Sequence, residues 1–455
     1  MTTRLFSSEQ TVKLARFATA FASRFGSTLL SFAVLYVASR LLPTLEYGLY
    51  VFLFSVGSAL GFIAVFGQQI LIVKHYRRSQ PGSNSGNRAL VRVNLHWLLL
   101  GSCVLTCAAL AVWFFGDHLV SPYNALPIAF LFAAIFALSE YLQNYFRIHN
   151  RIALSLLPRE IVWRGASAVA LLLVGYLNLP SSGVDAMLII TGLLATVTAY
   201  QAVSFAMAEG VSWISPTEKT SQPRFRKESL YFSANNVLNA STSYLETIVI
   251  GAALGLDNAA FYFVALRIAM LLTLPITAID TVGIPMIANR FQAGDREGAQ
   301  KLIGRLSCAS FLFSLVGALA IAVVGQFVLG LFNKEFASHF IVLLILCGVS
   351  VSQAFFGPGS WLLMIGGGER YFLVARSAIF IVYLGLLYWL GSLFGLTGIA
   401  IASVLLSVST NLAATFWVID HWGIDNMATA FFRPLTTRIH NNLHLASRIT
   451  SEPAE

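Results

Sequence analysis

The stretch VASRLLPTLEYGLYVF at residues 37–52 joins two long apolar runs. It carries two charges, Arg40 and Glu46, in a short segment that also contains Pro43 and Gly48. Proline and glycine commonly mark the end of one helix and the start of the next. The two charges can pair across the turn or meet lipid headgroups. The stretch therefore predicts the outer turn of a membrane hairpin.

The composition extends this prediction to the whole chain. Hydrophobic residues make up 57% of its 455 residues and charged residues only 11%, against roughly 25% charged in a soluble domain. Lipid leaves helices and closed barrels as the spanning structures, and barrel strands are shorter and alternate. We predict an all-α polytopic membrane protein with twelve spans near residues 17–39, 47–73, 94–115, 125–146, 161–179, 186–208, 231–255, 258–288, 307–332, 337–364, 371–393 and 396–419.

Basic residues set the orientation of these spans. With the N-terminus in the cytosol, 26 of the 29 Lys and Arg residues fall on the inner side, and Arg40, Lys334 and the intramembrane Arg267 are the exceptions. Such asymmetry is what the positive-inside rule predicts. We therefore expect a retained cytosolic start and both termini inside. The formal charge of +9 reflects topology and does not indicate a nucleic-acid partner.

A polar segment divides the chain. Residues 209–230 have the Ser, Pro and Lys content of a flexible cytosolic linker. We expect an N-terminal lobe of six helices at 1–208, a C-terminal lobe of six at 231–420, and a tail at 421–455. Four tail residues recur at three- and four-residue spacing, namely Phe432, Leu435, Ile439 and Leu443. The tail is therefore either an amphipathic helix on the inner surface or disordered.

Five of the charges inside predicted spans are candidate functional groups, namely Arg24, Glu140, Glu246, Arg267 and Asp280. A charge near the bilayer centre costs about 2.5–3.5 kcal/mol, so each needs a partner or an aqueous cavity. Arg24 and Glu140 both lie about 10 Å deep by the helical rise and could pair. Glu246 and Arg267 are level with each other on either side of a hairpin turn. These pairs are either structural or part of a functional cavity.

The polar residues of the predicted helix 231–255 favour the second interpretation, a functional cavity. Four polar residues follow one another at spacings of three, four and three: Asn236, Asn239, Ser243 and Glu246. A polar stripe this long is excluded from lipid and favours a position lining a watery chamber. In the next helix Asp280 lies just past Pro275, which we expect to kink that helix.

Three motifs carry a family resemblance. ASRLLPTLEYGLY (38–50), with its Arg, Pro, Gly and closing Tyr50, resembles the opening signature of Wzx-like oligosaccharide flippases in the multidrug/oligosaccharidyl-lipid/polysaccharide (MOP) exporter superfamily. LGLDNAAFYFVALRIAMLLTLP (254–275) and ANRFQAGDREGAQKLIGR (288–305) are similar to later family motifs. The likeness implies two six-helix lobes around a cavity that opens alternately to either side.

The resemblance also implies a function. Wzx-like members move a polyprenyl-pyrophosphate-linked oligosaccharide across the bacterial inner membrane for O-antigen, capsule or exopolysaccharide synthesis, and polymerases and export proteins are potential partners. Cationic side chains in the cavity hold the pyrophosphate in such proteins, which carries over to Arg24 and Arg267. The predicted stripe of Asn236, Asn239 and Ser243 would complete the substrate site. Glu140, Glu246 and Asp280 are candidates for ion coupling or charge pairing. Because of these acids, the charges assigned to the cavity do not sum to a clear net positive charge.

Two other function classes compete with this one. A cation-coupled multidrug exporter of the same superfamily would exchange a proton at Glu246 or Asp280. A membrane polymerase or glycosyltransferase needs a sizeable loop or domain, and the longest predicted outward loop spans only residues 116–124. The Gly-rich MIGGGERYF (364–372) lacks the Lys-Ser/Thr of a nucleotide loop. We therefore predict no enzyme activity and no cofactor or metal.

Overall fold

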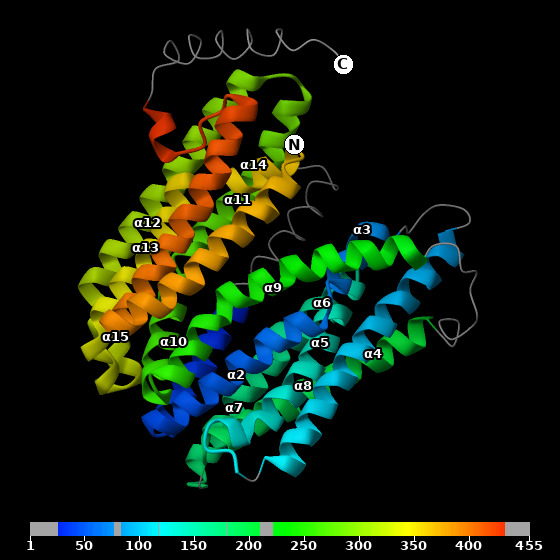
Figure 1. The fold of residues 1–455 in the computed structure, drawn as a ribbon, viewed down its shortest axis with the longest axis vertical. Helices are drawn as coiled ribbons and strands as arrows, with labels where there is room; N and C mark the ends of the chain where they lie inside the picture. The colour runs from blue at the N-terminus through cyan, green and yellow to red at the C-terminus, as the bar shows by residue number, and fades with distance from the viewer. Residues whose placement is uncertain (1–25, 77–82, 117, 180, 210–221, 433–455) are drawn as a thin grey trace, which may run out of the picture. The chain divides into compact units, whose positions relative to one another are not determined.

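The computed structural model describes residues 26–76, 83–116, 118–179, 181–209 and 222–432. These residues form helices joined by short turns, and none of them lies in a strand (Figure 1). Eight helical stretches of the described chain are long and apolar enough to cross a membrane, and two shorter apolar stretches, the helix Gly26–Leu41 and the end of a longer helix at Tyr244–Ala253, accompany them. The predicted all-α polytopic membrane fold is confirmed.

The chain forms two compact units that divide between Phe261 and Tyr262. The main helices of the first unit are Gly26–Leu41, α2 (Thr44–Ala64), α3 (Gln68–His75), α4 (Ser83–Phe115), α5 (Leu126–Ile148), α6 (Ile152–Leu156), the π-helix η2 (Leu157–Trp163), α7 (Arg164–Tyr176), α8 (Gly183–Glu209) and α9 (Gln222–Ala253). α9 begins inside the predicted linker. It packs against α2, α3 and α4. The predicted division into two lobes of six helices stays a prediction.

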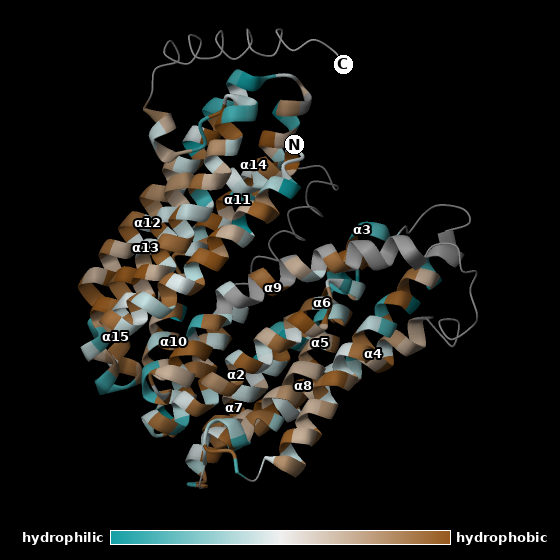
Figure 2. Cartoon of the chain, viewed as in Figure 1, coloured by the Kyte–Doolittle hydropathy of each residue, from teal (hydrophilic) through white to brown (hydrophobic). Residues whose placement is uncertain are grey.

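The division falls within α10 (Leu256–Met270), and the second unit continues with α11 (Thr273–Gln292), α12 (Arg296–Phe332), α13 (Phe340–Phe356), α14 (Gly359–Ile365), α15 (Glu369–Trp422) and the short η6 (Ala428–Phe431). Large apolar side chains are exposed along α4 of the first unit and α12 of the second, including Trp113 at 69% and Val323 at 84%. Figure 2 shows hydrophilic residues concentrated at the helix ends of the second unit. Exposed apolar flanks of this kind suit contact with lipid.

Three predicted spans differ from the structure. Two of them are each divided into two helices, and in the third the break lies before the expected position. The span 47–73 is wrong as a single helix, because Phe66 and Gly67 are left-handed and separate α2 from α3. The span 337–364 divides between α13 and α14. The kink expected at Pro275 lies earlier, at residues 271–272. Pro275 has no N–H for the carbonyl of Leu271, so the helix breaks one turn before the proline.

The spans 371–393 and 396–419 are the two halves of α15. Gly395 separates them with φ of 58° and ψ of −134°. This backbone conformation is strongly unfavourable for any residue that has a side chain. The hydroxyl of Tyr371 donates to the carbonyl oxygen of Ala413 at 3.3 Å. The two halves therefore lie side by side and run in opposite directions.

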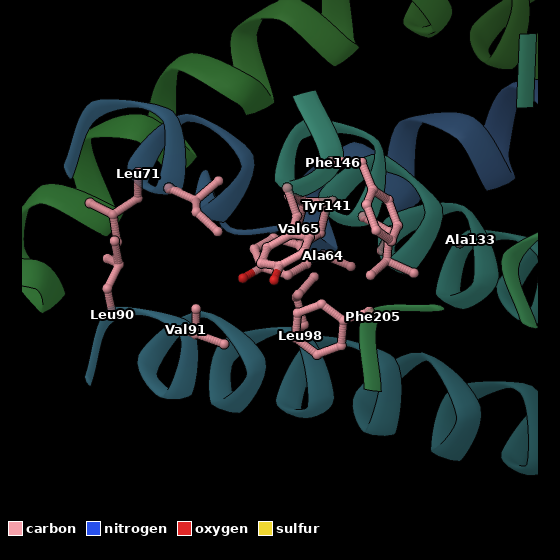
Figure 3. Close-up of a cluster of buried hydrophobic side chains, with 14 of the residues drawn as sticks. Ala64, Val65, Leu71, Leu90, Val91, Leu98, Ala133, Tyr141, Phe146 and Phe205 are labelled. Carbon is pink, nitrogen blue, oxygen red and sulfur yellow. The ribbon is translucent and has the colours of Figure 1, made fainter. Parts of the chain in front are cut away.

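A cluster of buried apolar side chains from α2, α3, α4, α5 and α8 forms the core of the first unit, and Tyr141 and Phe146 of α5 lie among them (Figure 3). α2 approaches α5 closely at two glycines. A Cβ at Gly57 would lie 2.9 Å from the carbonyl oxygen of Ala129, and one at Gly61 would lie 2.7 Å from the ring of Phe136. The two glycines are four residues apart, a small-xxx-small spacing that lets helix backbones approach closely. In lipid, where water supplies no hydrophobic driving force between helices, such close van der Waals packing stabilises their association.

Residues 423–432 fold back onto the second unit, although they belong to the predicted tail. The side chain of Asn426 is fully buried and donates to the carbonyl of Phe356 and to Thr415. Its backbone carbonyl accepts from Ser307 at 2.8 Å. The predicted amphipathic or disordered tail falls mainly on residues 433–455, outside the described residues.

The Gly-rich segment 366–368 lies against two indole rings. A Cβ at Gly366 would lie 2.5 Å from Trp422, and a Cβ at Gly368 would lie 2.7 Å from Trp417. Close packing against aromatic rings therefore accounts for glycine at these two positions.

Candidate functional site

A network of charged and polar side chains lies inside the first unit, where α5, η2, α7 and the helix Gly26–Leu41 meet. The turn between α5 and α6 brings these elements together. Asn150 takes a left-handed conformation with φ of 56°, and the Ser155 hydroxyl donates to the carbonyl of Gln143 at 2.7 Å. η2 then continues as a π-helix, a geometry found frequently at functional sites.

Arg159 of η2 is the centre of this network. Its guanidinium forms an ion pair with Glu140 and donates to Gln143 Oε1 at 2.9 Å. It also lies over the ring of Phe136, 4.3 Å from the centroid. The side chains of Arg159 and Glu140 are only 7% and 16% exposed. A pair this buried contributes rigidity and position more than net stability, because both ions have lost most of their water.

A second pair adjoins the first. Glu160 lies 3.2 Å from Arg164 Nη1 and accepts from the Ser27 hydroxyl. Gln143 links the two pairs, since its Nε2 donates to Glu160 Oε1 at 3.3 Å while its Oε1 accepts from Arg159. Arg164 also donates to the backbone carbonyl of Ser27 at 3.0 Å. Two carboxylates thus face two guanidinium groups in one network.

The predicted Arg24 lies outside the described residues, so its pairing with Glu140 stays a prediction. Within the described chain Glu140 pairs with Arg159, and Asn144 Nδ2 donates to its side chain at 3.3 Å. The backbones of Asn236, Asn239 and Ser243 lie in α9, but their side chains are outside what the structure describes.

The remaining predicted charges divide between the units. Glu246 of α9 is 4% exposed in the first unit. Arg267 of α10 belongs to the second, where its guanidinium lies 4.6 Å from the centroid of the Phe263 ring. Their proposed pairing therefore stays a prediction. Asp280 of α11 is partly buried, and no described residue forms an ion pair or hydrogen bond with its carboxylate.

The hairpin motif acts as a packing junction. Of the two alternatives for Arg40 and Glu46, pairing across the turn is not seen: Glu46 accepts a hydrogen bond from the backbone N–H of Gly183 at 2.7 Å, and Arg40 is exposed. Contact of these charges with lipid headgroups stays a prediction. Pro43 precedes the first residue of α2. A Cβ at Gly48 would lie 2.0 Å from the carbonyl oxygen of Leu256.

Tyr50, the last residue of the motif, is 2% exposed. Its ring centroid lies 6.1 Å from that of Tyr47. The motif therefore holds α2 against the start of α8 and the start of α10 by a hydrogen bond, a close backbone approach and buried aromatic rings.

Sequence reasoning missed Arg159, Glu160, Arg164 and Gln143 as one constellation. The signal was present in PREIVWR (158–164), where two arginines flank an acid inside an otherwise apolar helix start. The positive-inside pattern already accounts for both arginines as inner-side charges, because a basic residue near a helix end is usually solvated.

A model of the family described as polysaccharide biosynthesis protein matches residues 15–291, which is more than half of the chain. The chain belongs to this family. The predicted MOP superfamily membership is thereby confirmed. A search of curated protein sequences finds no match.

Solved structures of the superfamily share the fold. An inward-facing multidrug resistance MATE family transporter has a TM-score of 0.67 at 17% identity, covering 86% of this chain and 93% of its own. The lipid II flippase MurJ in an inward closed conformation has a TM-score of 0.67 at 12% identity, covering 96% of this chain and 94% of its own. At these identities the likeness establishes the fold alone.

Proposed function

We propose that this chain flips a polyprenyl-pyrophosphate-linked oligosaccharide across the bacterial inner membrane by alternating access. Membership of the polysaccharide biosynthesis protein family is the observation that carries the proposal. The fold shared with a flippase for another lipid-linked precursor supports it. The exported sugar would serve O-antigen, capsule or exopolysaccharide synthesis, with both termini of the chain in the cytosol. Transport of this kind makes or breaks no covalent bond.

The intramembrane charges receive roles within this proposal. Arg267 offers a planar guanidinium that suits phosphate oxygens in a bidentate geometry, and its position over the Phe263 ring orients it. Arg24 would be the corresponding cation of the first helix. Asn236, Asn239 and Ser243 would contact the sugar along α9. Glu246 and Asp280 would carry ion coupling or balance the two arginines.

The buried network around Arg159 has a different role in this scheme. Its acids and bases are already paired with one another, so it offers no unpaired positive charge to a pyrophosphate. We assign it the task of holding α5, η2 and the helix Gly26–Leu41 as one rigid body that moves as a unit. Rigid bodies around a central site are what alternating access requires.

Complementation of a deletion strain tests the proposal. Loss of the gene should abolish surface polysaccharide, and the wild-type chain should restore it. Arg267→Ala should insert normally but fail to restore polymer. Arg305→Ala, which changes an exposed basic residue of α12, is the matched control and should restore it. Normal polymer with Arg267→Ala would remove the phosphate role from Arg267, and normal polymer in the deletion strain would refute the flippase.

A second candidate is a cation-coupled multidrug exporter. The MATE transporter has the same TM-score as the flippase, so the fold suits both candidates equally. The partly buried Asp280 carboxylate, which has no hydrogen-bond donor or cation as a partner among the described residues, favours the exporter. An exporter predicts drug sensitivity on deletion with normal polysaccharide. Asp280→Asn should then reproduce the deletion phenotype, whereas a flippase predicts polymer loss with unchanged drug sensitivity.

A further inference from the structure

Arg376 is an intramembrane cation to which the mechanism above gives no task. It lies seven residues after Glu369, the first residue of α15. At about 1.5 Å of rise per residue it is about 10 Å along the helix. A guanidinium at that depth needs a counter-charge, acceptors or water.

The helical period places Arg376 on the inner face of α15. Tyr383, seven residues further on and therefore almost in line with it, is 1% exposed. Val374 lies about 200° away around the helix at 3.6 residues per turn. It is 69% exposed, as is Ile381, which shares its face. Arg376 itself is partly buried. The residue thus lies on the side of α15 that packs on protein.

The described part of the chain provides no acid for Arg376. Its guanidinium lies 6.0 Å from the centroid of the Phe372 ring. No ion pair or hydrogen bond joins it to a described residue, whereas Arg159 and Arg164 each contact a carboxylate. A partly buried guanidinium with unused donors on an interior face indicates an anionic ligand from outside the chain.

The neighbouring half of α15 is polar at this level. Tyr371 contacts Ala413, and the two halves run in opposite directions. Arg376, five residues after Tyr371, is therefore level with about residue 408, five residues before Ala413. Ser407 and Asn411 lie within one turn of that level. Both side chains are partly buried, and Asn411 donates to the Ser407 carbonyl at 2.9 Å. The surroundings therefore suit a hydrated or anionic group better than an acyl chain.

We propose that Arg376 binds the phosphate of a lipid that enters the second unit from the Glu369 end of α15. The phosphate belongs either to the pyrophosphate of the flipped substrate or to the headgroup of an inner-leaflet phospholipid. Helical side chains point toward the N-terminus of their helix, which is the cytosolic end in the proposed topology. The choice of substrate as source rests on the proposed flippase function.

Binding to two lipid probes tests the proposal. The full-length purified chain in detergent is titrated with undecaprenyl pyrophosphate and, separately, with phosphatidylglycerol, and the bound lipid is counted by native mass spectrometry. Arg376→Ala and Arg376→Gln should each weaken binding of at least one probe about tenfold or more, since a charge-assisted hydrogen bond is lost. Arg370→Ala, an exposed residue at the start of the same helix, is the matched control and should bind as wild type.

The probes separate the two sources. Loss confined to undecaprenyl pyrophosphate assigns Arg376 to the substrate, and loss confined to phosphatidylglycerol assigns it to the headgroup. Unchanged binding of both probes by a folded Arg376→Gln variant overturns the proposal. Failure of the wild-type chain to bind undecaprenyl pyrophosphate counts against the flippase instead, and the phosphatidylglycerol titration still decides Arg376.

Discussion

Breaking the Glu140–Arg159 pair should destabilise the first unit strongly. Glu140→Ala leaves the Arg159 guanidinium, 7% exposed, with Gln143, the Phe136 ring and the more distant Glu160 carboxylate, which is already paired with Arg164. Removing one partner of a buried ion pair costs about 3–5 kcal/mol, because the other charge loses its main compensation. Glu140 is itself 16% exposed, so water can reach the site and we expect the lower end, about 3 kcal/mol.

A double variant separates the charge from the packing. Glu140→Ala combined with Arg159→Met removes both charges and keeps most of the side-chain volume of Arg159, so it should recover much of the lost stability. Glu297→Ala is the control. It breaks a surface ion pair in which the side chain of Lys301 is 50% exposed and that of Glu297 is 63% exposed. The loss of this pair should lower the free energy of unfolding by less than about 1 kcal/mol.

The assay is the free energy of unfolding in mixed detergent micelles, together with the folded yield by size-exclusion chromatography. Two results would refute the reasoning. One is a Glu140→Ala variant no less stable than Glu297→Ala. The other is a double variant as unstable as Glu140→Ala alone, which would mean that packing and not charge decides the site.

Three further predictions concern packing. Gly61→Val should clash with the Phe136 ring, whose nearest carbon would lie 2.7 Å from a Cβ, and cost about 1–3 kcal/mol in the same assay; unchanged stability would contradict the close α2–α5 approach. Glu46→Ala should expose the start of α8 at Gly183 to faster hydrogen exchange, because the bond of 2.7 Å is lost, with exposed Arg40→Ala as the control. Asn426→Ala should cost about 1–3 kcal/mol and make residues 423–432 sensitive to protease, since the amide's bonds to Phe356 and Thr415 disappear; equal protease resistance would show that the segment is held elsewhere.

The helices were predictable because their cause is local. An apolar run of about 20 residues meets lipid wherever its neighbours lie, and its backbone must then satisfy itself as a helix. Every predicted span with described residues falls on a helix or on a broken pair of helices. The breaks were less predictable. Residues 65–67 carry no proline, and the effect of Pro275 appears one turn upstream of it.

Charge pairing was not predictable from spacing. Depth along each helix made Arg24 a candidate partner for Glu140, but depth fixes only one coordinate. The described partner, Arg159, reaches Glu140 because a left-handed residue at Asn150 and the π-helix that follows turn the chain back. Hydrophobic periodicity in the sequence does not predict such a turn.

The sequence alone determined that this is a helical membrane protein of the polysaccharide biosynthesis family, and it placed the predicted spans, because lipid acts on each segment separately. The tertiary structure decided which charges meet, which helices approach closely at Gly48 and Gly61, and that residues 423–432 pack against the second unit. These features depend on atoms far apart in the chain, whose approach is fixed only when the helices pack.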